Sequence, residues 1–144
     1  MRLKDIKALP KGPTHSITID VRFSEVDSLH IVWHGNYIKY MEDGREAFGR
    51  MYGISYLDIK KKGYTIPIVK INCEYKKPLK YGEKATINTT FIHTDAAKII
   101  FLTEIFNEAM ELVACGETIQ IFMDDQNELC LEVPEFYHQW KKQL

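Results

Sequence analysis

Asp27-Ser-Leu-His-Ile-Val-Trp-His34-Gly-Asn-Tyr37 is the segment around which the rest of the chain can be arranged. From Tyr37 to Met51, apolar residues recur at intervals of three and four, which predicts a helix with one buried face. Gly35 and Asn36 suit the start of this helix, because short residues leave its first backbone N–H groups open to a ligand. Asp27 precedes these amides by seven residues, so a group that Asp27 attacks would face them.

The predicted helix carries a glycine, Gly44, on its apolar face. Glycine in a helix interior costs roughly 1 kcal/mol relative to alanine. We therefore expect a bulky group or a neighbouring backbone to pack closely against this position.

The remaining chain alternates between strand-like runs and turn residues, without repeats or a linker-like boundary. Residues 14–23 alternate between polar and apolar side chains, as a half-buried strand does. Ser55 is expected to cap a short second helix that ends near Lys62. Four further strands and a C-terminal amphipathic helix are predicted at 66–77, 83–94, 97–107, 110–123 and 134–144. Short connections between successive strands predict antiparallel neighbours.

One long helix and five strands predict an α+β fold, in which the sheet wraps around the helix to bury both apolar faces. The length of 144 residues fits a single domain, residues 1–144. The runs 99–102 and 119–123 are apolar on both alternating faces. We therefore expect a partner subunit to cover the outer face.

The composition excludes several classes of protein. Hydrophobic residues make up 45% and charged residues 27% of the chain, as in a soluble globular protein. The net charge of −1 argues against a general nucleic-acid or membrane-surface binder. We also predict no membrane span and no secretion signal. The three cysteines are odd in number and lack metal-ligand spacing, so we expect a reducing, cytoplasmic location.

The loop and helix contain a specific pattern, and related residues follow downstream. The pattern comprises Asp27, Ile31-Val32-Trp33, His34, Asn36-Tyr37, Tyr40, Glu42 and Arg45, and the downstream residues are Tyr75, Pro78, Tyr81-Gly82 and Lys98. This combination resembles the 4-hydroxybenzoyl-CoA thioesterase family. The resemblance implies the hotdog fold, a five-stranded antiparallel sheet wrapped around one long central helix. It also implies a homo-oligomer, a dimer or homotetramer, whose subunits share active sites.

The chain departs from the family pattern at two positions. His30 stands where the family usually has glycine, and Gly44 stands where it usually has alanine. Histidine tolerates a positive φ better than most residues. If residue 30 needs a positive φ, we therefore expect the loop to keep its shape with histidine there.

The resemblance further implies the hydrolysis of an acyl-CoA or acyl-carrier-protein thioester, without a metal or other cofactor. In the family, the residue that matches Asp27 attacks the thioester carbonyl or activates a water molecule that does so, and the sequence leaves both roles open. At the position of His34, a backbone N–H polarises the carbonyl. The predicted substrate-binding residues are Glu25, Trp33, Asn36 and Tyr37. In an extended segment, Glu25 would point the same way as Asp27, and it is either a second acid or a solvated glutamate at the end of a strand.

Several alternatives stand beside this interpretation. Asp27, His30 and His34 have the composition of a metal-binding triad, but the histidines straddle the predicted junction of loop and helix, so we predict no metal site. Glu42 and Arg45 lie three residues apart and predict an ion pair along the helix. Two groups of lysines are either a solvated face or contacts to CoA phosphates, namely 60–62 and Lys76, Lys77 and Lys80. The rival function is a non-catalytic module that binds acyl-CoA, and His30 in place of the family glycine is the feature that keeps this alternative open.

Overall fold

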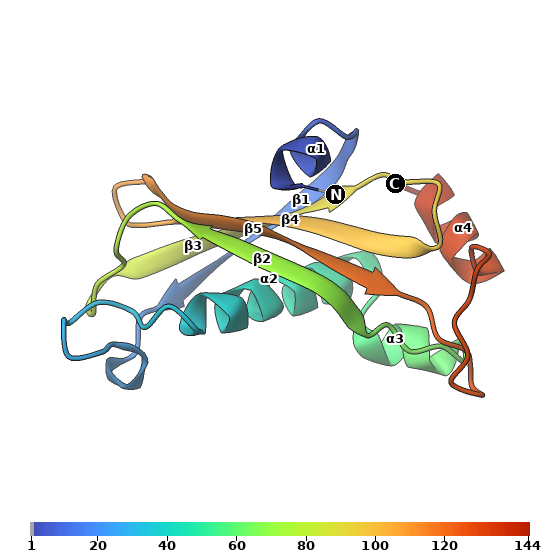
Figure 1. Cartoon of the computed structure of the whole chain (residues 1–144), viewed down its shortest axis with the longest axis horizontal. Coiled ribbons are helices and arrows are strands. Elements are labelled where there is room, and N and C mark those ends of the chain that lie inside the picture. The colour runs from blue at the N-terminus through green and yellow to red at the C-terminus, as the bar shows by residue number, and fades with distance from the viewer. Residues whose placement is uncertain (1) are drawn as a thin grey trace.

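The structure, a computed structural model that describes residues 2–144, is a five-stranded antiparallel sheet curved around one long helix (Figure 1). This arrangement confirms the predicted α+β hotdog architecture. The helices are α1 (Leu3–Lys7), α2 (Asn36–Tyr52), α3 (Tyr56–Lys61) and α4 (Glu135–Lys142), with a 3-10 turn, η1 (Phe23–Glu25). The strands are β1 (Lys11–Asp20), β2 (Ile68–Tyr75), β3 (Lys84–Ile92), β4 (Lys98–Phe106) and β5 (Leu112–Ile121).

The strands follow the order β1-β3-β4-β5-β2 across the sheet. The predicted antiparallel pairs of β3 with β4 and of β4 with β5 are confirmed. The expectation that β2 would neighbour β3 is wrong, because β4 and β5 lie between them and β2 pairs with β5. Gly116 allows β5 and β2 to approach, since a Cβ there would lie only 2.1 Å from the carbonyl oxygen of Asn72.

The long helix α2 lies against the inner face of the sheet, and the approach is closest at Gly44. A Cβ on Gly44 would lie 2.5 Å from Thr89 Oγ1 and 2.7 Å from Ile87 Cγ2, which confirms the close packing predicted at this glycine. One apolar cluster contains Tyr37 from the first half of α2, and a second contains Phe48 from its last turns. The helix is therefore held along its whole length.

The opposite face of the sheet is partly covered by the N-terminal helix α1, which the sequence did not predict (Figure 1). Leu3 and Ile6 of α1 are 6% and 0% exposed and pack in one cluster with Ile100, Leu102 and Ile119. The expectation that a partner subunit covers the outward side chains of the run 99–102 is therefore wrong, because this chain covers them itself. A five-residue helix is marginal alone and depends on this packing.

The helices α3 and α4 close the end of the sheet where α2 ends. The Ser55 hydroxyl accepts a hydrogen bond from Asp58 N at 3.2 Å, which confirms the predicted cap of α3. From α4, Trp140 Nε1 donates to Tyr52 O at 2.7 Å, and Tyr137 is fully buried. The loop that precedes α2 lies at the other end of the molecule (Figure 1).

Replacing Ile6 by alanine tests whether α1 stabilises the fold. Ile6 is 0% exposed, so we expect Ile6→Ala to lower the free energy of unfolding by roughly 2 kcal/mol, measured by urea denaturation. The matched control is Lys4→Ala, on the exposed side of the same helix, which should change stability by less than about 0.5 kcal/mol. Equal stability of both variants and the wild type would show that α1 does not dock on the sheet in solution.

Candidate active site

The loop between η1 and α2 contains a tight turn at residues 27–31. His30 N donates to Asp27 O, and Asp27 N donates to Ile31 O, both at 2.9 Å. His30 has a φ of +64°, in the left-handed region that histidine tolerates better than most residues. This confirms the expectation that the loop can carry histidine at a position of positive φ.

The carboxylate of Asp27 is half-buried in this turn. Its Oδ1 accepts a hydrogen bond from Leu29 N at 2.8 Å, an Asx turn that fixes the direction of the side chain. Its Oδ2 has no hydrogen-bond partner among residues 2–144. One carboxylate oxygen therefore anchors the group, and the other remains available to an incoming molecule.

The turn formed by His34 and Gly35 leads into α2. In the part of the chain that the structure describes, neither the N–H of His34 nor that of Gly35 donates to an acceptor. From β2, the Tyr75 hydroxyl donates to His34 O at 2.8 Å and holds this turn in place. Because the start of a helix carries partial positive charge, these two N–H groups are suited to an oxygen that becomes negative.

Trp33 and His34 lie at the surface beside these amides. Trp33 is 48% exposed, and its ring centroid lies 4.8 Å from that of His34. The indole also lies over Gly35, where a Cβ would be 2.1 Å from ring carbon Cζ3. A side chain at residue 35 would therefore displace Trp33 from the start of the helix.

The side chain of Glu25 does not point in the predicted direction. Residues 23–25 form the 3-10 turn η1 instead of an extended segment, so the expectation that Glu25 points the same way as Asp27 is wrong. Glu25 Oε1 accepts hydrogen bonds from Arg22 N at 2.7 Å and from the Tyr40 hydroxyl at 3.0 Å. Burial raises the pKa of Tyr40, and the hydrogen bond to Glu25 adds to the rise. Tyr40 thus stays a protonated donor, and Glu25 ties the loop to α2.

Asn36 and Tyr37 connect the helix start to its surroundings. Asn36 Nδ2 donates to Glu25 O at 2.8 Å, and Tyr37 accepts on its hydroxyl from Leu79 N at 3.2 Å. Tyr37 is 3% exposed, and burial raises its pKa. Of the predicted substrate-binding residues, Tyr37 therefore lies in the core, where it holds the connection between β2 and β3.

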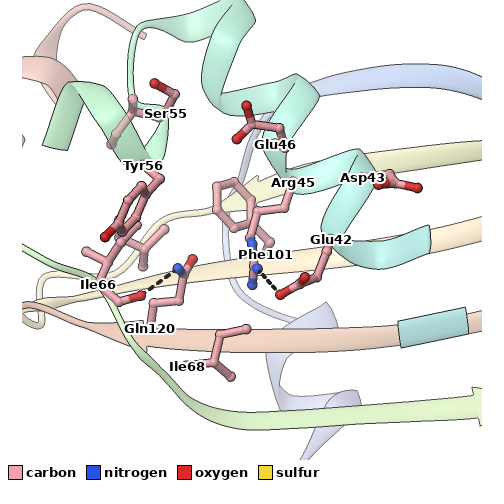
Figure 2. A pocket seen from close by; sticks show the side chains of 12 residues that line it. Glu42, Asp43, Arg45, Glu46, Ser55, Tyr56, Ile66, Ile68, Phe101 and Gln120 are labelled. Carbon is pink, nitrogen blue, oxygen red and sulfur yellow. Dashed lines mark hydrogen bonds and ion pairs between the residues drawn. The ribbon is translucent and has the colours of Figure 1, made fainter. Parts of the chain in front are cut away.

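Two hollows adjoin α2. The larger, about 750 Å³, lies beside the first half of the helix and is lined in part by Glu25 and Asn36. The smaller, about 530 Å³, lies between α2, α3 and the inner face of the sheet (Figure 2). Glu42 and Asp43 line both hollows, whereas Asp27 and His34 line neither. Burial, followed by the charge of Glu25, raises the pKa of Asp43.

The structure also bears on metal and membrane sites. Within residues 2–144, no group of three or more His, Cys, Asp or Glu side chains is arranged to hold a metal ion. Asp27, His30 and His34 therefore do not come together as a triad. No helix in the described residues has the length and apolar character that crossing a membrane requires.

No role was predicted from the sequence for Gln120, or for Tyr75 beyond its place in the family pattern. Tyr75 holds the turn before α2, yet it lies 41 residues from its partner His34 along the chain, and no local pattern reveals such a contact. Gln120 is buried on the inner face of β5, and its only signal is a polar residue within the apolar run 119–123. The predicted ion pair of Glu42 and Arg45 is confirmed, with Nη2 and Oε1 2.9 Å apart.

Comparison with known proteins identifies the family of this chain. The model of the thioesterase-like superfamily matches residues 21–141. A candidate acyl-CoA thioesterase, YneP of Bacillus subtilis (strain 168), is 36% identical over 122 residues, which cover 85% of this chain and 88% of YneP. The chloroplastic acyl-acyl carrier protein thioesterase ATL3 of Arabidopsis thaliana is 28% identical over 115 residues, or 78% of this chain and 60% of ATL3.

Among solved structures, the DHNA-CoA thioesterase of Staphylococcus aureus superposes with a TM-score of 0.80. The two chains are 27% identical, and the match covers 90% of this chain and 89% of the other. The likeness agrees with the hotdog architecture seen here. We conclude that this chain belongs to the thioesterase-like superfamily, as the residues of its loop and central helix indicated.

Proposed function

We propose that this protein hydrolyses an acyl thioester of CoA or of an acyl carrier protein, with Asp27 as the catalytic carboxylate. The observation that carries the proposal is the turn before α2. There, one oxygen of Asp27 is anchored and the other has no partner among residues 2–144. The N–H groups of His34 and Gly35, seven and eight residues later, are also unpaired within this range. A carboxylate can act as nucleophile or base, and a pair of amides can stabilise the oxyanion, in acyl transfer from a thioester.

The proposed chemistry places the thioester carbonyl between these components. The carbonyl oxygen accepts hydrogen bonds from the N–H groups of His34 and Gly35, and these bonds strengthen as the oxygen becomes negative. Removing one such donor typically costs about 3 kcal/mol of transition-state stabilisation. Asp27 either attacks the carbonyl carbon, after which water hydrolyses the mixed anhydride, or takes a proton from the attacking water. In both routes the C–S bond breaks, and the products are a free acid and a thiol.

The structure favours one of the predicted phosphate contacts. Lys76 and Lys77 form ion pairs with Glu74 and Glu111, and residues 60–62 belong to the α3 end of the molecule (Figure 1). Lys80, in contrast, is exposed, and its backbone forms a β-bridge with Ile31 beside the Asp27 turn. We therefore propose Lys80 as a contact to the phosphates of CoA or of a carrier's phosphopantetheine arm.

The proposal includes a homo-oligomer, a dimer or tetramer, in the cytoplasm. The oligomer is supported by β2, an edge strand on which Val69 and Tyr75 are 55% and 49% exposed, because exposed edge strands tend to be covered in natural proteins. The location is supported by Cys73, Cys115 and Cys130, which are all free thiols, as a reducing compartment maintains them.

The rival function, a non-catalytic acyl-CoA-binding module, rested on His30 in place of the family glycine. The positive φ of His30 and the two backbone hydrogen bonds of its turn support a loop that keeps its tight turn with histidine at this position. Hydrolysis is therefore the function that the geometry supports best.

Replacing Asp27 by asparagine tests the catalytic carboxylate. An asparagine oxygen can still accept the bond from Leu29 N, so the turn should persist. We expect Asp27→Asn to lower kcat by about 100-fold or more, measured by thiol release from a panel of acyl-CoA thioesters, while acyl-CoA still raises the melting temperature. The control, Asp95→Asn, alters an exposed carboxylate on another loop and should keep full turnover. Undiminished activity of Asp27→Asn would remove this residue from the mechanism.

Replacing Tyr75 by phenylalanine tests how the two amides are held. The change removes the hydrogen bond to His34 O, and a bond of this kind is worth about 1 kcal/mol. We expect kcat to fall roughly fivefold with little change in KM, because the amides act mainly on the transition state. Tyr81→Phe is the matched control, since Tyr81 is similarly exposed and packs against Phe23. Equal losses in both variants would contradict a specific role for Tyr75.

A further inference from the structure

The loop that carries the proposed catalytic carboxylate is a short hairpin. Val26 and Val32 form an antiparallel bridge, and the turn at residues 27–31 joins them. At the base of this hairpin, Glu25 O accepts a hydrogen bond from Trp33 N at 2.9 Å. Glu25 therefore lies where the segment before the turn meets the segment that leads to α2.

Two side chains of α2 bind Glu25 at this base, and each binds a different part of it. Asn36 Nδ2 donates to the carbonyl oxygen of Glu25 at 2.8 Å, and the Tyr40 hydroxyl donates to its Oε1 at 3.0 Å. Residues four apart on a helix lie on the same face, so the first turns of α2 hold Glu25 at two points. We call Glu25, Asn36 and Tyr40 together the Glu25 clamp.

The two helix residues of the Glu25 clamp are buried, which makes the contact a firm one. A hydrogen bond to a carboxylate is stronger than one between neutral groups, and the loss of one partner leaves the other polar group unsatisfied. Burial and the bond to Glu25 raise the pKa of Tyr40, so its hydroxyl remains a donor. The base of the hairpin is therefore fixed to the helix.

We propose that Asn36 and Tyr40 are positioning residues for the hydrolysis, and that they act through Glu25. This inference rests on the proposed function. Asp27 follows Glu25 by two residues, and the two proposed oxyanion donors are the N–H groups that immediately precede Asn36. The Glu25 clamp therefore joins the segment that carries the carboxylate to the segment that carries the amides, and it sets their relative position.

The competing interpretation is direct contact with the substrate, because Glu25, Asn36 and Tyr40 all line the larger hollow. The observed hydrogen bonds favour positioning. The Tyr40 hydroxyl and an N–H of Asn36 are already donated to Glu25, and Glu25 Oε1 also accepts from Arg22 N at 2.7 Å. A residue that binds substrate uniformly affects KM, whereas one that positions reacting groups affects kcat. Steady-state kinetics therefore separates the two interpretations.

The first experiment removes each donor of the Glu25 clamp and measures thiol release from an acyl-CoA thioester. We expect Asn36→Ala and Tyr40→Phe each to lower kcat about tenfold with KM within about twofold, because small displacements of reacting groups are costly. If one variant does not fold, the other provides the test. A rise in KM with kcat unchanged would assign these residues to substrate binding and overturn the inference.

The matched controls make the same chemical changes elsewhere in the protein. Asn88→Ala alters an asparagine on β3, and Tyr52→Phe alters the last residue of α2. Both should keep the kcat of the wild type. Losses in the controls equal to those in Asn36→Ala and Tyr40→Phe would contradict a specific role for the Glu25 clamp.

Replacing Glu25 separates positioning from acid–base chemistry. Glutamine keeps an oxygen that can accept from the Tyr40 hydroxyl, whereas leucine does not. We expect Glu25→Gln to retain a several-fold higher kcat than Glu25→Leu, with the pH profile of the wild type. Equal losses in both variants, or a pH profile that loses one limb in Glu25→Gln, would show that the carboxylate itself reacts and would overturn the inference.

The outcomes separate this inference from the proposed function. Turnover by the wild type with undiminished kcat in Asn36→Ala and Tyr40→Phe would overturn the inference and leave the thioesterase proposal standing. If the wild type hydrolyses no thioester, the proposed function fails, and hydrogen exchange then tests whether the Glu25 clamp holds the loop. Both variants, but not Tyr52→Phe, should speed amide exchange in residues 26–35 about fivefold. Unchanged exchange would overturn the inference.

Discussion

The contact between α2 and β3 at Gly44 is the constraint on which the rest of the structure depends. Because no side chain separates the helix from Thr89 and Ile87, α2 lies directly on the sheet, and the sheet curves around it. Tyr37 then anchors the first turn of α2 to the connection between β2 and β3. A helix start that is fixed in this way gives the N–H groups of His34 and Gly35 a defined direction, which the proposed stabilisation of a negative oxygen would need.

Two acids of the same loop acquire different roles through their hydrogen bonds. The carboxylate oxygen Oε1 of Glu25 takes bonds from Arg22 N and from the Tyr40 hydroxyl, so Glu25 serves as a connection between loop and helix. Asp27 takes one bond from Leu29 N within its own turn, and its other oxygen has no partner in the part of the chain that the structure describes. The difference arises from backbone geometry, since η1 rotates Glu25 toward α2 while the turn at 27–31 holds Asp27 beside its own backbone.

Buried polar atoms without partners are rare in folded proteins, and most of those recorded within residues 2–144 lie where α2 meets the sheet. Thr89 and Thr118 on the inner face each have an unpartnered hydroxyl, and Arg45 and Gln120 add two further atoms beside the smaller hollow. These groups form a polar band between the apolar cluster around Tyr37 and the one around Phe48. The fold therefore retains hydrogen-bonding capacity next to the smaller hollow, whose lining is both polar and apolar.

Local pattern was sufficient to predict the long central helix and the five strands. The spacing of three and four that predicted a helix from Tyr37 to Met51 matches α2. The five strands were predicted from alternation, and the close packing at Gly44 from the low helix propensity of glycine. Local pattern could not predict α1, whose few residues become helical through Leu3 and Ile6 against the sheet. Nor could it predict that β2 pairs with β5, that Glu25 turns toward Tyr40, or that Tyr75 holds His34. Periodicity, capping and turn chemistry act between neighbours in the chain and can therefore be read from it, whereas these contacts join distant segments and form only when the sheet closes around α2.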